Sequence, residues 1–311
     1  MRKLLLQFIT LLSITAMWSQ QEVQYTQYMY NMSTINPAYT TGNIGIYNLG
    51  ALYRTQWVGV TGAPKSANLF AHTPINENIE VGLTYVNDNI GDIVKENNIF
   101  ADFAYKLNLE EFGYLSFGLK AGMSFFNVDF TNLDLESGSM FIDPNFSENI
   151  NQSNFNVGVG AYYNTDNYYV GFSIPFLLKS DHSISESGDY QNIQKPHFYL
   201  TGGYVFDINE AFKLKPSLMA KAVNGAPISL DLNANVLYEN RLEFGLGYRI
   251  NDGLIGMINF GITPELRLGY AYDYTLSNLD AFSSGSHEFF LLYNLDSFNF
   301  NRGFDKSPRF F

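Results

Sequence analysis

The chain has 311 residues, of which 16% are aromatic and 15% are charged, and it contains no cysteine. The absence of cysteine excludes disulfides, thiolate metal sites and a lipidated N-terminal cysteine. The net charge of −12 argues against nucleic acid as a partner, because binding to phosphates requires basic residues. The 27 Phe, 22 Tyr and 26 Gly are typical of an outer-membrane β-barrel, although a soluble all-β protein could share this composition.

The N-terminus has the features of a secretory signal peptide. Arg2 and Lys3 precede an apolar run that ends at Ala16, and the small Ser19 offers a cleavage point. A membrane-spanning helix needs about 20 apolar residues, so this run is shorter than a retained transmembrane anchor would require. We therefore expect residues 1–19 to be a signal peptide and the chain to be exported. Residues 20–43 are then an N-terminal periplasmic segment or a plug inside the lumen.

Residues 44–295 repeat a short amphipathic segment about fourteen times. In residues 241–249, for example, apolar side chains occupy the even positions, and charged residues or glycines occupy the odd ones. Most segments approach the roughly 9–11 residues that a tilted strand needs to cross the hydrocarbon layer. The alternation predicts an all-β fold, a transmembrane antiparallel up-and-down β-barrel of about 14 strands in the outer membrane. Residues 253–262 alternate most weakly.

The links between these segments alternate in length. Even-numbered links are short, whereas four of the odd-numbered links are long and polar, namely residues 88–94, 131–152, 178–196 and 276–286. Outer-membrane barrels have short periplasmic turns and longer extracellular loops, and a β-sandwich has no reason to sort its loops in this way. The pattern predicts that both termini lie in the periplasm, including a C-terminal tail at residues 296–311.

Strand parity places a set of charged residues on the inward-facing side. An Arg or Lys on the lipid face near the bilayer centre would cost roughly 2–4 kcal/mol, so these charges should face the lumen. We predict that they form an ion-pair network that stiffens the barrel or holds a plug, and the alternative is the lining of a solute pore. Gly158, Gly160, Gly245 and Gly247 share this side and would leave room for an inserted segment. The predicted lumenal charges are Lys120, Asp231, Arg241, Glu243, Arg249, Arg267, Asp273 and Glu288.

The sequence does not predict a catalytic, cofactor or metal site. Ser286, His287 and Glu288 contain the side chains of a hydrolase triad, but neighbours on a strand point to opposite faces. The acidic run from Asp88 to Glu96 lacks the spacing of an EF-hand calcium loop. We therefore expect a protein that is not an enzyme and that uses no cofactor.

The long link at residues 131–152 combines acidic residues with exposed apolar ones. Apolar side chains in an outer loop often mark an interaction surface, and the alternative is a cap over the mouth of the barrel. The candidate partner-docking residues in this loop are Met140, Phe141, Ile142 and Phe146.

Several short motifs resemble one known family in the same order along the chain. Residues 27–30 (QYMY) and 35–39 (INPAY) resemble the opening signature of the PorP/SprF family of Bacteroidota outer-membrane proteins. Residues 54–60 (RTQWVGV), 62–64 (GAP) and 71–74 (AHTP) are similar to the most recognisable stretch of that family. The matching positions that we single out are Asn36, Pro37, Ala38, Tyr39, Arg54, Gln56, Trp57, Gly59, Pro64, His72 and Pro74.

The resemblance implies a non-enzymatic component of the type IX secretion system that, in many members, serves gliding motility. One branch of the family associates with the periplasmic ring and peptidoglycan-linked proteins of the machine. The other branch holds the C-terminal sorting domains of large secreted adhesins at the cell surface, and the long outer loops favour this second branch. Two alternatives remain open, a channel for small or hydrophobic solutes and a structural surface barrel. The expected partners are thus outer-membrane lipid and proteins of the secretion pathway.

Overall fold

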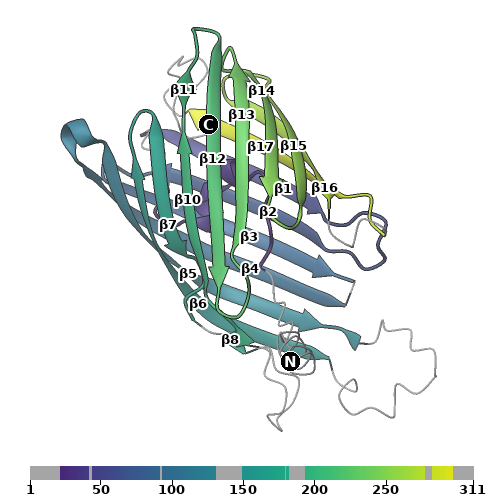
Figure 1. The fold of residues 1–311 in the computed structure, drawn as a ribbon. Helices are drawn as coiled ribbons and strands as arrows, with labels where there is room; N and C mark the ends of the chain where they lie inside the picture. Colours follow the sequence, from purple (N-terminus) through teal and green to yellow (C-terminus); the bar gives the residue numbers. More distant parts are fainter. Residues whose placement is uncertain are drawn as a thin grey trace, which may run out of the picture.

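Fourteen antiparallel strand crossings close into a barrel in the described part of the chain (Figure 1). The structure is a computed structural model, and it describes residues 22–41, 44–91, 93–130, 149–178, 180–181, 193–276 and 282–296. Each strand pairs with its neighbours in sequence, and β1 closes the ring by pairing with β17 from Ile46↔Asp296 to Thr55↔His287. The predicted up-and-down β-barrel is therefore confirmed.

The wall strands follow the alternation of the sequence with small shifts at their ends. They are β1 (Ile46–Thr55), β2 (Lys65–Pro74), β3 (Ile79–Ile90), β4 (Val94–Asn108), β5 (Tyr114–Val128), β6 (Ile150–Asn164), β7 (Tyr168–Ile174), β10 (His197–Tyr204), β12 (Phe212–Val223), β13 (Ser229–Tyr238), β14 (Leu242–Arg249), β15 (Gly253–Gly261), β16 (Leu266–Thr275) and β17 (Ser286–Asp296). The two-residue β11 (Phe206–Asp207) continues the line of β10, and β10 pairs with both β7 and β12. A separate hairpin of β8 (Ser180–Asp181) and β9 (Ile193–Gln194) lies in the link between β7 and β10.

Side chains alternate between an apolar outer wall and a polar lumen. On β14, for example, Leu246 is 74% exposed on the outer wall while Glu243 is fully buried on the lumenal side. Large apolar side chains are exposed in the same way on nearly every wall strand. This apolar exterior is what a barrel in lipid requires. No helix in the described residues is long and apolar enough to cross a membrane.

The links sort by length between the two ends of the barrel, with one exception to the prediction. Short turns such as residues 75–78 and 165–167 lie at one end, and the long links at residues 129–149 and 175–196 lie at the other, which we take as the outer end. The predicted long loop at residues 88–94 is wrong, because β3 extends to Ile90 and β4 begins at Val94. Asn87, Asn89 and Asn97 are polar on the outward side there, which hid the strand in the sequence pattern.

Residues 22–41 lie inside the lumen and lead through Ile44 and Gly45 into β1 at the short-turn end (Figure 1). This segment contains the 3-10 helix η1 (Tyr28–Tyr30) and the single-turn helix α2 (Met32–Ile35). Nearly all of its residues from position 25 to position 41 are buried. We call residues 22–41 the plug. The predicted signal peptide, almost all of the C-terminal tail and the four apolar residues of the loop at 131–152 lie outside the described residues.

A charge placed on the outer wall tests whether this wall faces lipid. We expect Leu246→Arg to destabilise the barrel by roughly 2–4 kcal/mol, because the guanidinium would lie in hydrocarbon. The matched variant Ile262→Arg, at an exposed turn, should cost only about 0–1 kcal/mol. Urea unfolding in lipid vesicles measures both values, and equal small costs would show that the wall at Leu246 is in contact with water.

Candidate functional site

The plug is held by wall residues that bind its backbone directly. Near its C-terminal half, the Lys120 ammonium donates to the Thr34 carbonyl at 2.9 Å, and the Ser173 hydroxyl donates to the Ile35 carbonyl at 2.9 Å. A segment with so little secondary structure leaves some of its peptide groups without internal partners, and burying them unpaired would be costly. The wall therefore supplies the hydrogen bonds that the plug cannot make itself.

Asn36 connects the plug to β6 and β7. Its side-chain amide donates to the Ala161 carbonyl at 3.1 Å and lies 3.4 Å from the Phe172 carbonyl, and its oxygen accepts the Ala38 N–H at 2.9 Å. Pro37 follows and cannot donate from its own backbone nitrogen. In this chain the Asn36 amide thus serves a turn of the plug and the wall at once.

Glycines in the wall make room for this turn. A Cβ added at Gly118 would overlap the backbone of Pro37 and Ala38, and one at Gly160 would overlap the Asn36 amide. Of the four glycines predicted to make room for a plug, only Gly160 faces it in this way.

The other three glycines serve the wall itself. Gly158 lies against the Pro175 backbone, Gly245 against the Asn235 side chain and Met257, and Gly247 against the Asn233 side chain. Strand parity identifies an inward glycine, but it does not say which neighbour requires the space.

The inner anchor of the plug lies where β2 and β3 meet the short-turn end. Glu80 accepts the Thr41 N–H at 2.9 Å and its hydroxyl at 3.1 Å, and His72 Nδ1 lies 2.8 Å from the same carboxylate. The Tyr39 ring packs edge-on against the His72 ring at 5.7 Å. His72 and Tyr39, which the family motif singled out, thus meet in space. Pro74 is the buried last residue of β2.

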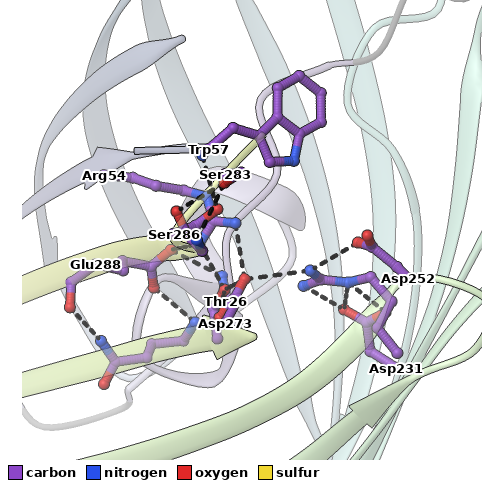
Figure 2. A network of polar contacts seen from close by, with 12 residues as sticks. Thr26, Arg54, Trp57, Asp231, Asp252, Asp273, Ser283, Ser286 and Glu288 are labelled. Carbon is purple, nitrogen blue, oxygen red and sulfur yellow. Dashed lines mark hydrogen bonds and ion pairs between the residues drawn. The ribbon is translucent and has the colours of Figure 1, made fainter. Parts of the chain in front are cut away.

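The outer anchor joins the start of the plug to β1, β16 and β17 (Figure 2). The two Glu288 oxygens accept the Thr26 N–H at 2.8 Å and the Gln27 N–H at 2.7 Å. Arg54 binds Asp273 at 2.7 Å and Glu288 at 3.3 Å, and it also donates to the Thr26 hydroxyl at 2.7 Å. One guanidinium therefore contributes positive charge to two carboxylates that are buried close together.

A second arginine extends this anchor around the lumen. Arg249 binds Asp231 at 3.0 Å, and the same guanidinium lies 3.3 Å from both Asp252 and Asp273 (Figure 2). The ion pairs thus form a chain in which Asp273 is shared between Arg249 and Arg54. We call this chain, with Glu288, the outer latch.

A third group of charges binds the plug near the short-turn end. Glu243 pairs with Lys215 at 3.0 Å and accepts hydrogen bonds from the Asn235 amide at 2.5 Å and from the Tyr30 hydroxyl. Burial raises the pKa of the Tyr30 hydroxyl of the plug well above its usual range, so this group stays protonated and donates. The Tyr30 ring also stacks on Phe290 at 4.6 Å.

The predicted lumenal charges therefore occupy separate groups and not one network. Asp231, Arg249, Asp273 and Glu288 belong to the outer latch, Glu243 lies below it, and Lys120 pairs with Asp102 at 3.4 Å on the other side of the plug.

The two remaining arginines of that prediction lie at the short-turn end. Arg267 is half-buried and donates to the Asn240 carbonyl at 3.2 Å. Arg241 is exposed at the turn before β14, with its guanidinium 4.8 Å from the Phe260 ring centroid, so it does not face the lumen. Strand parity fails for Arg241 because the strand has not yet begun at this position.

Sequence reasoning missed several charges that bind the plug or pair in the lumen. Glu80, Asp102 and Lys215 are buried on the lumenal side, and Arg54 was singled out as a motif residue without a lumenal role. Their positions were available from strand parity, since Arg54 follows the outward-facing Tyr53 on β1.

The remaining motif residues form the rim of the first outer hairpin, residues 56–64. The Gln56 N–H donates to the Pro64 carbonyl at 3.0 Å and closes the hairpin, while the Trp57 N–H donates to the Ser286 hydroxyl at 3.1 Å. Trp57 has a φ of 48° and Gly59 a φ of 101°, so the chain bends sharply here. Figure 2 shows the Trp57 ring pointing away from the outer latch.

Ser286, His287 and Glu288, the side chains of the rejected hydrolase triad, do not meet in the structure. Ser286 and Glu288 are buried in the lumen, whereas His287 lies on the outer wall, as the alternation of a strand requires. No group of three or more His, Asp or Glu residues in the described ranges is placed to hold a metal ion. The arrangement serves to bind an internal segment.

Crowding at Gly118 tests the fit of the plug. We expect Gly118→Ala to cost about 1–3 kcal/mol, because the added methyl group would displace Pro37 and Ala38. Gly256→Ala is the matched control, since nothing lies within 4 Å of a Cβ at that position. Hydrogen exchange of residues 35–40 should accelerate in the first variant alone. Unchanged exchange in Gly118→Ala would show that the plug does not rest on β5.

Removal of the Glu288 carboxylate tests the outer latch. We expect Glu288→Ala to destabilise the barrel by about 3–5 kcal/mol, since it leaves two buried plug amides without their acceptor and removes one of the two carboxylates that Arg54 binds. Glu288→Gln should cost less because one acceptor oxygen remains, and the exposed Glu77→Ala should change stability by no more than about 0.5 kcal/mol. Urea unfolding and hydrogen exchange at residues 22–30 measure these effects. Equal stability of the Ala variants at 77 and 288 would contradict the latch.

Comparison with known proteins identifies the family. No curated protein matches the chain in sequence. Among solved structures, a FadL homologue of Pseudomonas aeruginosa is 14% identical with a TM-score of 0.48, covering 85% of this chain and 94% of its own. The toluene transporter TodX of Pseudomonas putida is 12% identical with a TM-score of 0.47 and coverages of 86% and 94%. The outer membrane protein Omp33 of Acinetobacter baumannii is 9% identical with a TM-score of 0.44 and coverages of 82% and 100%.

The sequence comparison covers most of the chain. The family model for the type IX secretion system membrane protein PorP/SprF matches residues 18–293, which include the plug and nearly the whole barrel wall. The chain therefore belongs to the PorP/SprF family of type IX secretion system membrane proteins.

Proposed function

We propose that this chain is a closed, non-enzymatic platform of the type IX secretion machinery that holds a large secreted adhesin at the outer surface. The adhesin would be bound through its C-terminal sorting domain at the outer end of the barrel. Family membership gives the coarser part of this statement, a membrane component of type IX secretion in the outer membrane. The finer part is supported by the buried plug and by the shape of the outer end.

The plug in the lumen is the observation that carries the proposal. Its residues between Tyr25 and Thr41 are almost all buried, and both of its ends are anchored to the wall by carboxylates, Glu288 at the outer end and Glu80 at the inner end. A freely permeable pore would need a continuous aqueous path, and the plug fills the section where that path would run. A binding role needs no such path.

The outer side of the plug forms a hollow that opens away from the short-turn end. We call it the vestibule, and its free volume is about 200 Å³. Its lining contains both apolar and charged side chains. Such a mixed lining suits contact with a protein surface, which also carries both kinds of group, better than contact with a purely apolar solute. Its apolar lining includes Phe100, Phe126, Phe176 and Met219, and its charged lining includes Asp88, Glu96 and Lys221.

The strands around the vestibule extend past the apolar belt. Outward-facing asparagines replace apolar residues at the outer ends of β3 to β6, where Asn87 donates to Asn97 at 2.8 Å and Asn127 donates to Asn151. Polar amides do not belong in hydrocarbon, so these strand ends stand in the aqueous or head-group region. The strand ends beside the vestibule thus project on the side from which a partner at the cell surface would approach.

The core-machinery branch of the family is the competing interpretation. It would place the important contacts at the short-turn end, where the periplasmic ring and peptidoglycan-linked proteins lie. The vestibule and the long outer links favour the adhesin branch, in which binding occurs at the opposite end.

Charge reversal at the two ends distinguishes the branches. Glu96 lines the vestibule, whereas Glu110 lies on an exposed turn at the other end of the barrel, and each is replaced by lysine. The amount of adhesin that co-purifies with native outer-membrane complexes is measured by mass spectrometry. We expect this amount to fall at least tenfold in Glu96→Lys and to stay unchanged in Glu110→Lys. Substituting serine at Met140, Phe141, Ile142 and Phe146 should have the same effect as Glu96→Lys. Loss of periplasmic ring proteins in Glu110→Lys, with adhesin binding intact in Glu96→Lys, would contradict the proposal.

Conductance measurements distinguish the platform from a solute channel. The wild-type barrel in a planar bilayer should be closed, and deletion of residues 22–40 should open it because the plug is then absent. A wide, steady conductance of the wild type would contradict the platform and support the channel. Unchanged conductance after the deletion would show that the plug does not close the lumen.

A further inference from the structure

A groove runs along the outer wall beneath the first outer hairpin, on the opposite side of the wall from the outer latch. Residues 56–64 form its roof, and outward-facing residues of β1, β2, β16 and β17 form its floor. Its volume is about 790 Å³. Neither the secretion role nor the plug accounts for this groove.

The roof of the groove is held in place by backbone hydrogen bonds. The Val58 N–H donates to the Gly285 carbonyl at 2.8 Å, and the Ser284 N–H donates to the Val58 carbonyl at 2.7 Å. Together with the bond from Gln56 to Pro64, these contacts join the hairpin to the end of the neighbouring link. The groove is therefore a preformed feature of the wall.

Polar side chains gather at the outer end of the groove. Lys65 and His287 both lie beside Thr55 in the strand register, so the three residues form one outward-facing row. The Tyr270 hydroxyl and His287 Nδ1 share a hydrogen bond of 2.7 Å, and the Tyr272 ring lies 5.2 Å from the His287 ring. The imidazole is thus fixed at the outer end of the floor, with the exposed Lys65 ammonium two strands away.

Apolar side chains form the opposite end. Phe289 lies one row deeper than His287 on the same face of β17, and Val58 and Val60 of the roof also line the groove. The floor continues into exposed apolar residues of the outer wall, with Tyr53 on β1 directly beside Phe289 and Leu291 one row deeper on β17. The groove therefore leads from a hydrogen-bonding outer end directly into the belt that faces lipid.

The groove is lined by basic residues, although the chain as a whole is acidic. The protein has 30 acidic and 18 basic residues, yet the described residues that line the groove include Lys65 and His287 and no Asp or Glu. A basic, hydrogen-bonding end joined to an apolar floor is complementary to an anionic amphiphile. We propose that the groove binds a phosphorylated lipid of the outer leaflet, with its phosphate at Lys65 and His287 and an acyl chain along Phe289.

Binding of bisphosphorylated lipid A to the folded barrel tests this proposal. The full-length protein in detergent is titrated with lipid A, and the bound lipid is counted by native mass spectrometry. We expect Lys65→Glu to weaken binding at least tenfold, and because Lys65 is exposed this variant should fold normally. His287→Gln should weaken binding in the same direction.

Two controls make the result specific. Lys195→Gln removes one charge from the outer rim beside β10, which lies on the far side of the ring from β1, and should leave binding unchanged. Dephosphorylated lipid A should bind at least tenfold more weakly than the phosphorylated form. Pyrophosphate alone should not compete at equal concentration.

Three results would overturn the assignment. They are wild-type affinity in Lys65→Glu, equal binding of the dephosphorylated lipid, and full competition by pyrophosphate, which would indicate a site for the free anion. None of these outcomes bears on adhesin co-purification, so the two proposals succeed or fail separately.

Discussion

The structure depends on satisfying the peptide groups of a buried segment that has almost no secondary structure of its own. Inside the barrel, the wall strands already use their backbone hydrogen bonds on one another, so side chains of the wall pair with peptide groups of the plug. This is why charged and hydroxyl groups point inward at the contact points. Glu288, Lys120 and Glu80 bind plug amides or carbonyls on three different sides of the lumen.

The same requirement explains the arrangement of charges between strands. A carboxylate that accepts plug amides is buried, and burying it without a cation would cost several kcal/mol. Arg54 supplies that cation for Glu288 and Asp273, and Arg249 supplies a second one for Asp273 and Asp231. The latch therefore joins β1, β13, β14, β16 and β17 through side chains, so that the plug and that part of the wall stabilise each other.

Strand alternation predicted the barrel because lipid imposes an apolar face on every crossing, and it predicted the inward direction of residues such as Asp231 and Glu243. It could not predict their separate groups, since partners on different strands depend on strand register and on the plug. The weak alternation of residues 253–262 has the same origin. Ile255 and Met257 face inward and join the apolar cluster around the plug, so β15 is apolar on both faces.

The first hairpin and the plug are connected through side-chain contacts at both ends of β1 and β2. The plug precedes β1 in the chain, and Arg54 at the outer end of β1 binds Thr26. Glu80, which binds Thr41, also contacts His72 at the inner end of β2. Only Thr55 separates Arg54 from the hairpin that forms the roof of the outer groove, and Ser286 contacts that hairpin two residues from Glu288. A ligand that fixes the hairpin would therefore also restrain the two residues that hold the outer end of the plug. The motif residues of the plug, β1, the first hairpin and β2 lie along this path, which connects the outer end of the barrel with the segment inside its lumen.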